Sequence, residues 1–260
     1  MTIIEFLLTQ VDVYLLILVR VTGLFAVVPV LGNENIPMMA RIGTSVMTSF
    51  ILLPLVGETT VVAMDSFALF AYYIIQELLI GLAIGFVGTV YFAMFFLAGT
   101  IMDRQTGFAL ANVIDPLTDM EVPIFGNFYN ILFILLFLGI NGHHMFIRAI
   151  YDSYDFLPIG HALTIDLNLV ELMIGFFRDI TVLAFILSAP VMMTAFLANV
   201  VLGIFAKTMP QINVFVVGMP LRIIVGLLTI WITLQTILPF SEGFFERIFH
   251  GIYNFMRILA

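Results

Sequence analysis

The chain contains no cysteine and little charge. Without cysteine, neither a disulfide framework nor thiolate chemistry is available. Only 10% of its 260 residues are charged and 62% are hydrophobic, a composition typical of integral membrane proteins and far from that of soluble domains. The net charge of −8 reflects a scarcity of Lys and Arg rather than blocks of carboxylates. This pattern argues against nucleic acid as a partner.

Sequence signatures of enzymes are also lacking. The chain has no G-x-S-x-G nucleophile motif, no Walker loop and no G-x-G-x-x-G fingerprint. His143 and His144 invite a metal site, but adjacent residues of a helix point about 100° apart and neither histidine has a carboxylate four residues later. A capping or hydrogen-bonding role is favoured for both. We therefore expect no catalytic residues, no bound metal and no cofactor.

Apolar sequence is abundant, in runs that predict an all-α integral membrane protein with about six long, partly broken helices. The runs cover about residues 11–31, 42–56, 67–102, 122–140, 169–206 and 214–240. Their lengths fit a bilayer badly, because residues 67–102 as one helix would reach roughly 50 Å against a hydrocarbon core of roughly 30 Å. Prolines at positions 29, 54, 190, 210 and 220 are expected to break these helices, with neighbouring protein satisfying the freed backbone groups.

The chain is expected to form a single domain, residues 1–260, that ends in an amphipathic helix at about 241–260. No repeat of fixed period and no low-complexity linker divides it. In the last segment, apolar side chains from Phe244 to Met256 have helical spacing and lie opposite Glu246, Arg247 and His250. That helix is expected to lie on a membrane or on a partner protein. The N-terminus, with acidic residues and no small-residue cleavage site, is expected to be retained.

Four charged side chains in or beside the apolar runs are expected to be buried against protein. An isolated charge at the centre of a bilayer costs at least ~3 kcal/mol, so lipid is an unfavourable environment for them. The set comprises Arg20, Arg104, Arg178 and Asp179.

Glu77, Gly81, Gly85 and Gly88 follow one another at steps of four, four and three, so they share one helix face. Such a face carries one carboxylate and then a groove without side chains, which allows another helix to approach closely. Two alternatives follow. The face packs against another helix of this chain, or it contacts another subunit in which Glu77 is hydrogen-bonded.

Residues 98–123 run from a helix into a loop in which the charges nearly cancel and several side chains are apolar. A solvated connector is one interpretation. The apolar side chains favour a loop that packs into something, and intramembrane loops tend to line cavities, so we predict a constriction or gate. The expected gate residues are Thr106, Gly107, Phe108, Ala109, Leu110, Asn112, Val113, Ile114, Asp115 and Pro116.

Residues 207–222, KTMPQINVFVVGMPLR, place two cations and two prolines between long apolar runs. Unpaired charge and unsatisfied backbone at membrane depth cost several kcal/mol, so this segment must be buried in protein or line a wet cavity. The pattern predicts a membrane protein that works inside an assembly or around a conduit.

Several segments, taken in order, resemble one family. They are VRVTGLFAVVPVLG from Val19, QELLIGLAIGF from Gln76, AGTIMDRQTGF from Ala98, FLGINGHH from Phe137, and PQINVF from Pro210 followed by GMPL. Through nearly its whole length the chain is similar to the R subunit of the bacterial flagellar export gate, whose relatives are the T subunits of type III secretion injectisomes.

The resemblance implies a structural, pore-forming subunit that conducts unfolded flagellar proteins across the bacterial inner membrane at the flagellar basal body. Its implied partners are about five P-type and about four Q-type subunits in a helical arrangement, a B switch subunit, the exported proteins and membrane lipid. A plug is implied on the loop after QTGF, about residues 106–122, and residues 207–222 resemble a Q-subunit hairpin that faces its neighbours. The expected subunit interface comprises Glu77, Gly81, Gly85, Gly88, Lys207, Pro210, Gln211, Asn213, Phe215, Gly218, Pro220 and Arg222.

A secondary transporter of a small solute is the rival interpretation, because broken helices with Gly, Pro and isolated charges also build substrate sites near the bilayer midplane. No internal repeat supports it. A third possibility, an intramembrane hydrolase, lacks a recognisable nucleophile or metal set. Basic residues are scattered over almost every segment between the runs, so the sequence does not predict the membrane orientation.

Overall fold

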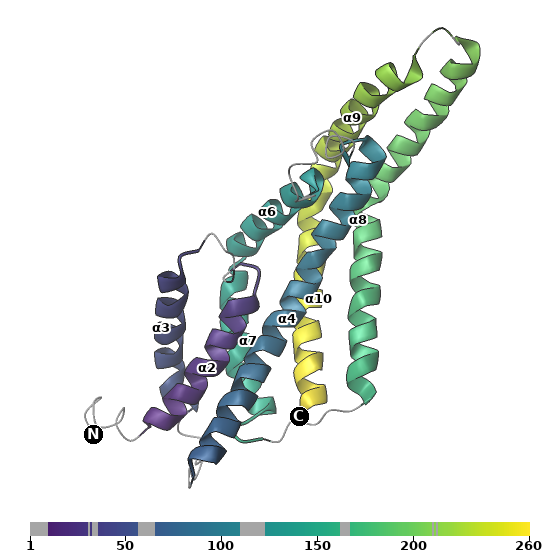
Figure 1. Ribbon diagram of the computed structural model, residues 1–260. Helices are drawn as coiled ribbons and strands as arrows, with labels where there is room; N and C mark the ends of the chain where they lie inside the picture. The colour runs from purple at the N-terminus through teal and green to yellow at the C-terminus, as the bar shows by residue number, and fades with distance from the viewer. Residues whose placement is uncertain are drawn as a thin grey trace. The chain divides into compact units, whose positions relative to one another are not determined.

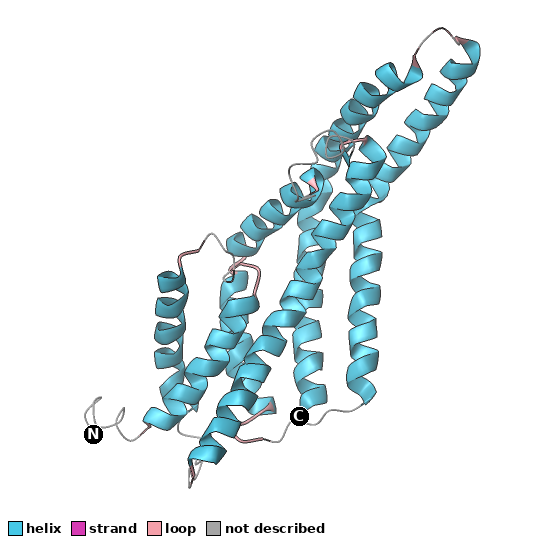
Figure 2. Cartoon of the chain, in the orientation of Figure 1, coloured by secondary structure: helices cyan, strands magenta, loops and turns pink. Residues whose placement is uncertain are grey.

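The computed structural model describes residues 10–30, 32, 36–56, 66–109, 123–161, 167–209, 211 and 213–260. Within these ranges every regular element is a helix, which confirms the all-α expectation (Figure 2). In chain order (Figure 1) the elements are α2 Val11–Val27, α3 Met38–Val56, α4 Phe67–Thr106, α6 Ile124–Gly139, α7 Gly142–Phe156, α8 Leu167–Thr208, α9 Val214–Thr233, the 3₁₀ turn η1 Leu234–Thr236 and α10 Ile237–Leu259.

Two helices are much longer than a bilayer requires. α4 has 40 residues and α8 has 42, each in one unbroken helix. At 1.5 Å per residue both reach roughly 60 Å, about twice the thickness of a hydrocarbon core. Four helices among the described residues are long and apolar enough to cross a membrane, or up to five if the broken pair α6 and α7 forms one span.

The prolines break fewer helices than expected. Pro54, Pro190 and Pro220 lie inside α3, α8 and α9 respectively, and the helices continue through them. Hydroxyl groups support α8 around its proline, since Ser188 Oγ donates to the carbonyl three residues earlier and Thr194 Oγ1 donates to the carbonyl of Pro190. The expectation of a break at these three prolines was therefore wrong, and in α8 the hydroxyl groups beside Pro190 contribute to the continuity of the helix.

Helix α7 lies between two of the apolar runs, where no helix was predicted from the sequence. Phe146, Ala149 and Ile150 are fully buried on one face of this helix, whereas Arg148 and Asp155 on the other face are exposed. Asn141, in the left-handed conformation at φ 59°, precedes the helix, and its carbonyl accepts the backbone N–H of the residue three positions later. The polar composition of the segment reflects the outer face of an amphipathic helix.

The chain divides into two compact units. Unit 1 comprises Met1–Tyr91, Phe137–Phe176 and Phe245–Ala260, and unit 2 comprises Phe92–Leu136 and Phe177–Phe244. Helices α4, α6, α8 and α10 each contribute residues to both.

In unit 1, α2 packs beside α3 (Figure 1), and the core also includes α7 and most of α10. The ring of Phe146 in α7 lies 5.3 Å, centroid to centroid, from that of Phe249 in α10. The apolar face of α10 was expected to lie on a membrane or a partner, but in unit 1 it packs into its own chain. The buried residues of that face are Phe245, Ile248, Phe249, Ile252, Phe255 and Met256.

Aromatic rings form the core of unit 2. Phe95 and Phe133 are fully buried with ring centroids 4.3 Å apart, and Phe244 packs against both at 5.1 and 5.6 Å. Helix α8 is bound to α9 by a hydrogen bond of 2.9 Å from Thr229 Oγ1 to Thr194 Oγ1. Unit 2 thus joins helices through rings and hydroxyl groups.

Candidate functional site

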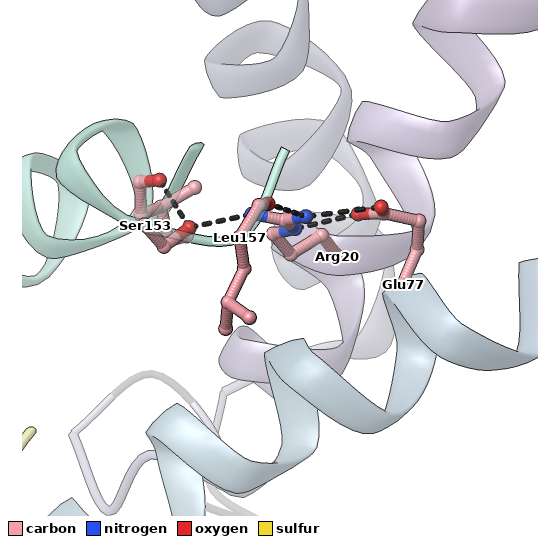
Figure 3. A network of polar contacts seen from close by, with 5 residues as sticks. Arg20, Glu77, Ser153 and Leu157 are labelled. Atoms are coloured by element: carbon pink, nitrogen blue, oxygen red, sulfur yellow. Dashed lines mark hydrogen bonds and ion pairs between the residues drawn. The ribbon is translucent and has the colours of Figure 1, made fainter. Parts of the chain in front are cut away.

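A buried polar network occupies the centre of unit 1. The guanidinium of Arg20, on α2, is fully buried and forms a two-point ion pair with Glu77 of α4, whose side chain is 1% exposed. Arg20 also donates to Ser153 Oγ at 2.8 Å and to the carbonyl of Leu157 at 2.9 Å (Figure 3). The ring of Tyr154 lies 3.8 Å from the guanidinium carbon, within range of a cation–π contact. One side chain therefore ties α2, α4 and α7 together.

The energetics of this network depend on its being complete. Removing two charges from water costs several kcal/mol per ion, which only good geometry and further hydrogen bonds offset. The planar fork of Arg20 meets both conditions, since Glu77 receives two of its N–H groups and Ser153 and Leu157 receive others. Loss of one partner would leave an uncompensated charge in the core.

The glycines that follow Glu77 allow the close approach on which this network depends. A Cβ on Gly81 would lie 2.1 Å from the carbonyl oxygen of Arg20, and one on Gly85 would lie 3.0 Å from that of Leu24. A Cβ on Gly88 would lie 3.0 Å from the ring of Phe146 in α7. Of the two alternatives for this face, the structure therefore shows packing within the chain. The interface predicted for its four residues is corrected, because α2 and α7 already occupy the face.

Of the four charges expected to be buried, the chain by itself buries only Arg20. Arg104 is exposed, and the side chain of Arg178 is 77% exposed. Asp179 is 33% exposed, with its carboxylate 3.8 Å from the Arg178 Nε. Burial of Arg104 and Arg178 against protein therefore stays a prediction that concerns neighbouring subunits, because the chain itself leaves both exposed.

The first predicted gate residues lie at the end of α4 in unit 2. Thr106 is fully buried, and Gly107 ends the helix with φ 92°. The ring of Phe108 meets that of Phe125 edge to face at 5.3 Å, and Ala109 is half-buried. The other predicted gate residues, Leu110, Asn112, Val113, Ile114, Asp115 and Pro116, lie outside the described residues.

A contact between the end of α4 and the start of α6 was not predicted from the sequence. Asp103, 5% exposed, accepts the backbone N–H of Ile124 at 2.6 Å and that of Phe125 at 3.3 Å. The available signal was a carboxylate in an apolar helix together with Pro123, because a proline at the start of a helix offers no side-chain oxygen to cap it.

The hairpin of α8 and α9 contains the remaining predicted interface residues. Lys207, Gln211, Asn213 and Pro220 are exposed, and Gly218 is buried against α8. Pro210 lies outside the described residues, as does the side chain of Phe215. These positions place the exposed residues where a neighbouring protein could contact them.

Arg222 is half-buried in the same hairpin, and it is the only charged residue of α9. Its Nε is buried without a hydrogen-bond partner, and so is Oδ1 of Asn199 on α8. Among the described residues this arginine therefore contrasts with Arg20, whose donors are matched.

Histidines do not form a metal site in the described ranges. The rings of His143 and His144 lie 4.2 Å apart, and no group of three or more His, Cys, Asp or Glu side chains there could hold an ion.

Comparison with known proteins matches most of the chain. The family model of bacterial export proteins, family 1, matches residues 11–248. A flagellar biosynthetic protein FliR of Bacillus subtilis is 30% identical over 250 residues, covering 95% of both chains. The FliR of Escherichia coli K12 is 30% identical over 243 residues, covering 94% of this chain and 92% of its own. The Yop proteins translocation protein T of Yersinia pestis is 28% identical over 211 residues, covering 80% of each.

Proposed function

We propose, because this chain belongs to family 1 of the bacterial export proteins, that it is a structural, pore-forming subunit of the flagellar type III export gate. The observation that carries the proposal is the match over residues 11–248. Relatives named for flagellar biosynthesis cover more of the chain than the Yersinia translocation protein does, which favours flagellar use. The comparisons give no support to a small-solute transporter.

The proposed gate conducts unfolded flagellar proteins across the bacterial inner membrane and performs no covalent chemistry. Its partners are other components of the export apparatus, specifically about five P-type and about four Q-type subunits around one copy of this chain, with a B switch subunit. Energy for export comes from elsewhere in the apparatus.

The exposed apolar surface of α8 supports a protein environment. Only 28% of its most apolar window is buried within the chain, whereas 61% of the corresponding window of α4 is buried. A lipid core of about 30 Å covers half of a helix of about 60 Å. The exposed face of α8 includes Phe177, Phe196 and Phe205, and the part of it that extends beyond the lipid core requires cover by other subunits.

The gate itself is proposed to include residues 106–122. Its described start is apolar and packed, with Thr106 fully buried and Phe108 against Phe125. A loop that presents apolar side chains to a lumen excludes ions by keeping water out, and it can yield when a polypeptide enters. This mechanism predicts that shortening the loop increases ion leakage.

Arg222 is proposed to receive a carboxylate from a neighbouring subunit. Arg222 shares a face of α9 with Gly218 and Thr229, which pack against α8. Val217, Ile224 and Leu228 are exposed on the opposite face, so a neighbouring subunit has room to lie against this helix. A guanidinium whose Nε is buried without an acceptor needs a charged partner at membrane depth. Arg104 and Arg178, both exposed, are proposed to be covered in the same assembly.

Co-expression with the P-type and Q-type subunits tests the function. The complex extracted in detergent is weighed by native mass spectrometry, and a mixed particle with one copy of this chain and several copies of each partner is expected. A stable monomer that forms no mixed particle would contradict the proposal. For Arg222, suppressors of a non-motile Arg222→Glu strain are expected to replace an acidic residue of a partner by a basic one, and Arg222→Leu with normal swarming would refute the assignment.

A further inference from the structure

One stripe of α4 in unit 2 contacts the start of α6 and the middle of α9. Its residues are Gly99, Asp103 and Thr106, spaced by four and three, so they lie on one helix face. A Cβ on Gly99 would lie 2.1 Å from the backbone nitrogen of Gly126, so the two helices touch through their backbones. One turn later Asp103 accepts the first N–H groups of α6, and after another turn Thr106 packs against Gly226 of α9.

The Asp103 carboxylate performs the task that an N-cap side chain usually performs. The first N–H groups of a helix have no partners inside it and carry its positive dipole end. The carbonyl of Pro123 accepts the N–H of Asn127, which places this proline at the N-cap position, yet its side chain has no oxygen. Asp103 therefore caps α6 from another helix, with both of its oxygens used.

The backbone of Asp103 also fixes the exit of the loop. Its carbonyl accepts the N–H of Gly107 at 3.0 Å, and Gly107 has a φ of 92° that favours glycine. The turn directs Phe108 onto Phe125, whose ring is 3% exposed. One residue therefore holds both ends of the connection between α4 and α6.

We propose that Asp103 is a positioning residue for the gate loop. Its carboxylate holds the first turn of α6 against the last turn of α4, so the connection leaves and rejoins unit 2 at one point. This proposal rests on the proposed function, because residues 106–122 act as the gate there. Without the carboxylate, the N–H groups of Ile124 and Phe125 lose their partner in an apolar environment and the contact between Phe108 and Phe125 loosens.

Disulfide cross-linking tests the position directly, since the chain has no cysteine of its own. Phe108→Cys and Phe125→Cys are introduced together into the assembled complex, with Asp103 intact or changed to Asn or Leu. Loss of a helix cap shifts the equilibrium between the state in which residues 108 and 125 are in contact and the state in which they are apart by roughly five- to thirtyfold. We expect the cross-linking rate to fall by up to that factor in Asp103→Leu and by less in Asp103→Asn, whose amide oxygen retains one acceptor. Asp155→Leu, at an exposed carboxylate in unit 1, is the matched control and should leave the rate unchanged.

Ion leakage through the assembled gate, measured with the phenylalanines intact, gives the functional readout. Leakage should increase in the order Asp, Asn and Leu at position 103, and deleting residues 110–114 should abolish the difference between them. The amount of each variant recovered in the complex distinguishes a loss of positioning from misfolding. If Asp103→Leu is not recovered, the comparison of Asp103→Asn with the unchanged chain tests the proposal.

Two failures are distinguishable. Unchanged cross-linking in the recovered variant, together with a leaky loop deletion, overturns the role of Asp103 alone. A loop deletion that does not leak overturns the gate function of the loop and the gating role of Asp103 with it, whatever the cross-linking shows.

Discussion

Arg20 and Arg222 both interrupt apolar helices, but among the described residues the Nε of Arg20 has an acceptor and that of Arg222 has none. In unit 1 the guanidinium of Arg20 has Glu77, Ser153 and Leu157 as hydrogen-bond partners. In unit 2 the Nε of Arg222 is buried without one. Arg20 is thus satisfied within unit 1, whereas the Nε of Arg222 is the donor that we propose a neighbouring subunit satisfies.

Gly81 and Gly203 differ in what surrounds them. In unit 1 Gly81 lets two helices of one chain meet over a satisfied ion pair. In α8 of unit 2, Gly203 has nothing within 4 Å of an added Cβ, and its apolar neighbours Val200 and Ile204 are exposed. A small residue on an exposed apolar face allows another helix to approach closely. Gly81 therefore serves a contact within the chain, whereas Gly203 lies on apolar surface that is open to another helix.

The largest effect is expected from removing the partner of Arg20. Glu77→Ala leaves the guanidinium buried with no counter-charge, which should cost about 3–5 kcal/mol of stability. Thermal unfolding in detergent and the amount of chain in the membrane measure the loss. Asp155→Ala, at an exposed carboxylate in the same unit, is the control. Full stability of Glu77→Ala would show that unit 1 does not depend on the ion pair.

Replacing both Arg20 and Glu77 sharpens the test of the ion pair. Arg20→Met combined with Glu77→Leu removes the two charges together, so it should recover part of the stability lost in Glu77→Ala. A double variant less stable than Glu77→Ala would mean that the Arg20 contacts with Ser153 and Leu157 contribute more than the charge pair itself.

Arg222→Met should affect assembly rather than folding. Truncating one member of a buried charge pair across an interface costs about 2–5 kcal/mol of association. Recovery of the chain with its partners should fall, while the amount of chain in the membrane stays the same. Arg222→Lys keeps the charge and should recover part of the complex. If Arg222→Met lowers the amount of chain as strongly as Glu77→Ala does, the contrast between the units is broken.

Gly81→Ala should have a smaller effect on unit 1. The added methyl would meet the backbone carbonyl of Arg20 at 2.1 Å, and overpacking of this kind typically costs about 1–3 kcal/mol. Gly175→Ala in α8 is the matched control, because nothing lies within 4 Å of its Cβ position and the exchange should raise helix stability slightly. Thermal unfolding compares them, and equal midpoints would mean that α2 and α4 can separate without loss.

Much of the fold follows from sequence periodicity, because an apolar run in lipid or protein has few alternatives to a helix. The runs ending at Val56 and Met102 correspond closely to α3 and α4. The same reasoning found the glycine face of Gly81 and the burial of Arg20. These features depend on local spacing and on the cost of an isolated charge, both of which can be read from one segment at a time.

The remaining features depend on contacts between distant segments. Arg20 and Glu77 are 57 positions apart, and Asp103 caps a helix that begins 21 positions later, so no local pattern pairs them. Apolarity also does not tell which side of α8 faces outward, so the exposure of Arg178 in the chain alone could not be predicted. α7 was missed because its polar face dominated its composition.

The smallest effect is expected from the exposed ion pair of α8. Arg178 and Asp179 approach only to 3.8 Å, and Arg178 is 77% exposed. Exposed pairs contribute about 0–1 kcal/mol, so Arg178→Ala should leave the amount of chain in the membrane close to normal, and Asp179→Ala should do the same. Recovery of the complex should fall only if a neighbour covers Arg178 in the assembly. A loss of the chain itself, as large as that in Glu77→Ala, would mean that Arg178 is buried within its own fold, and the division between a self-satisfied unit 1 and an assembly-dependent unit 2 would no longer hold.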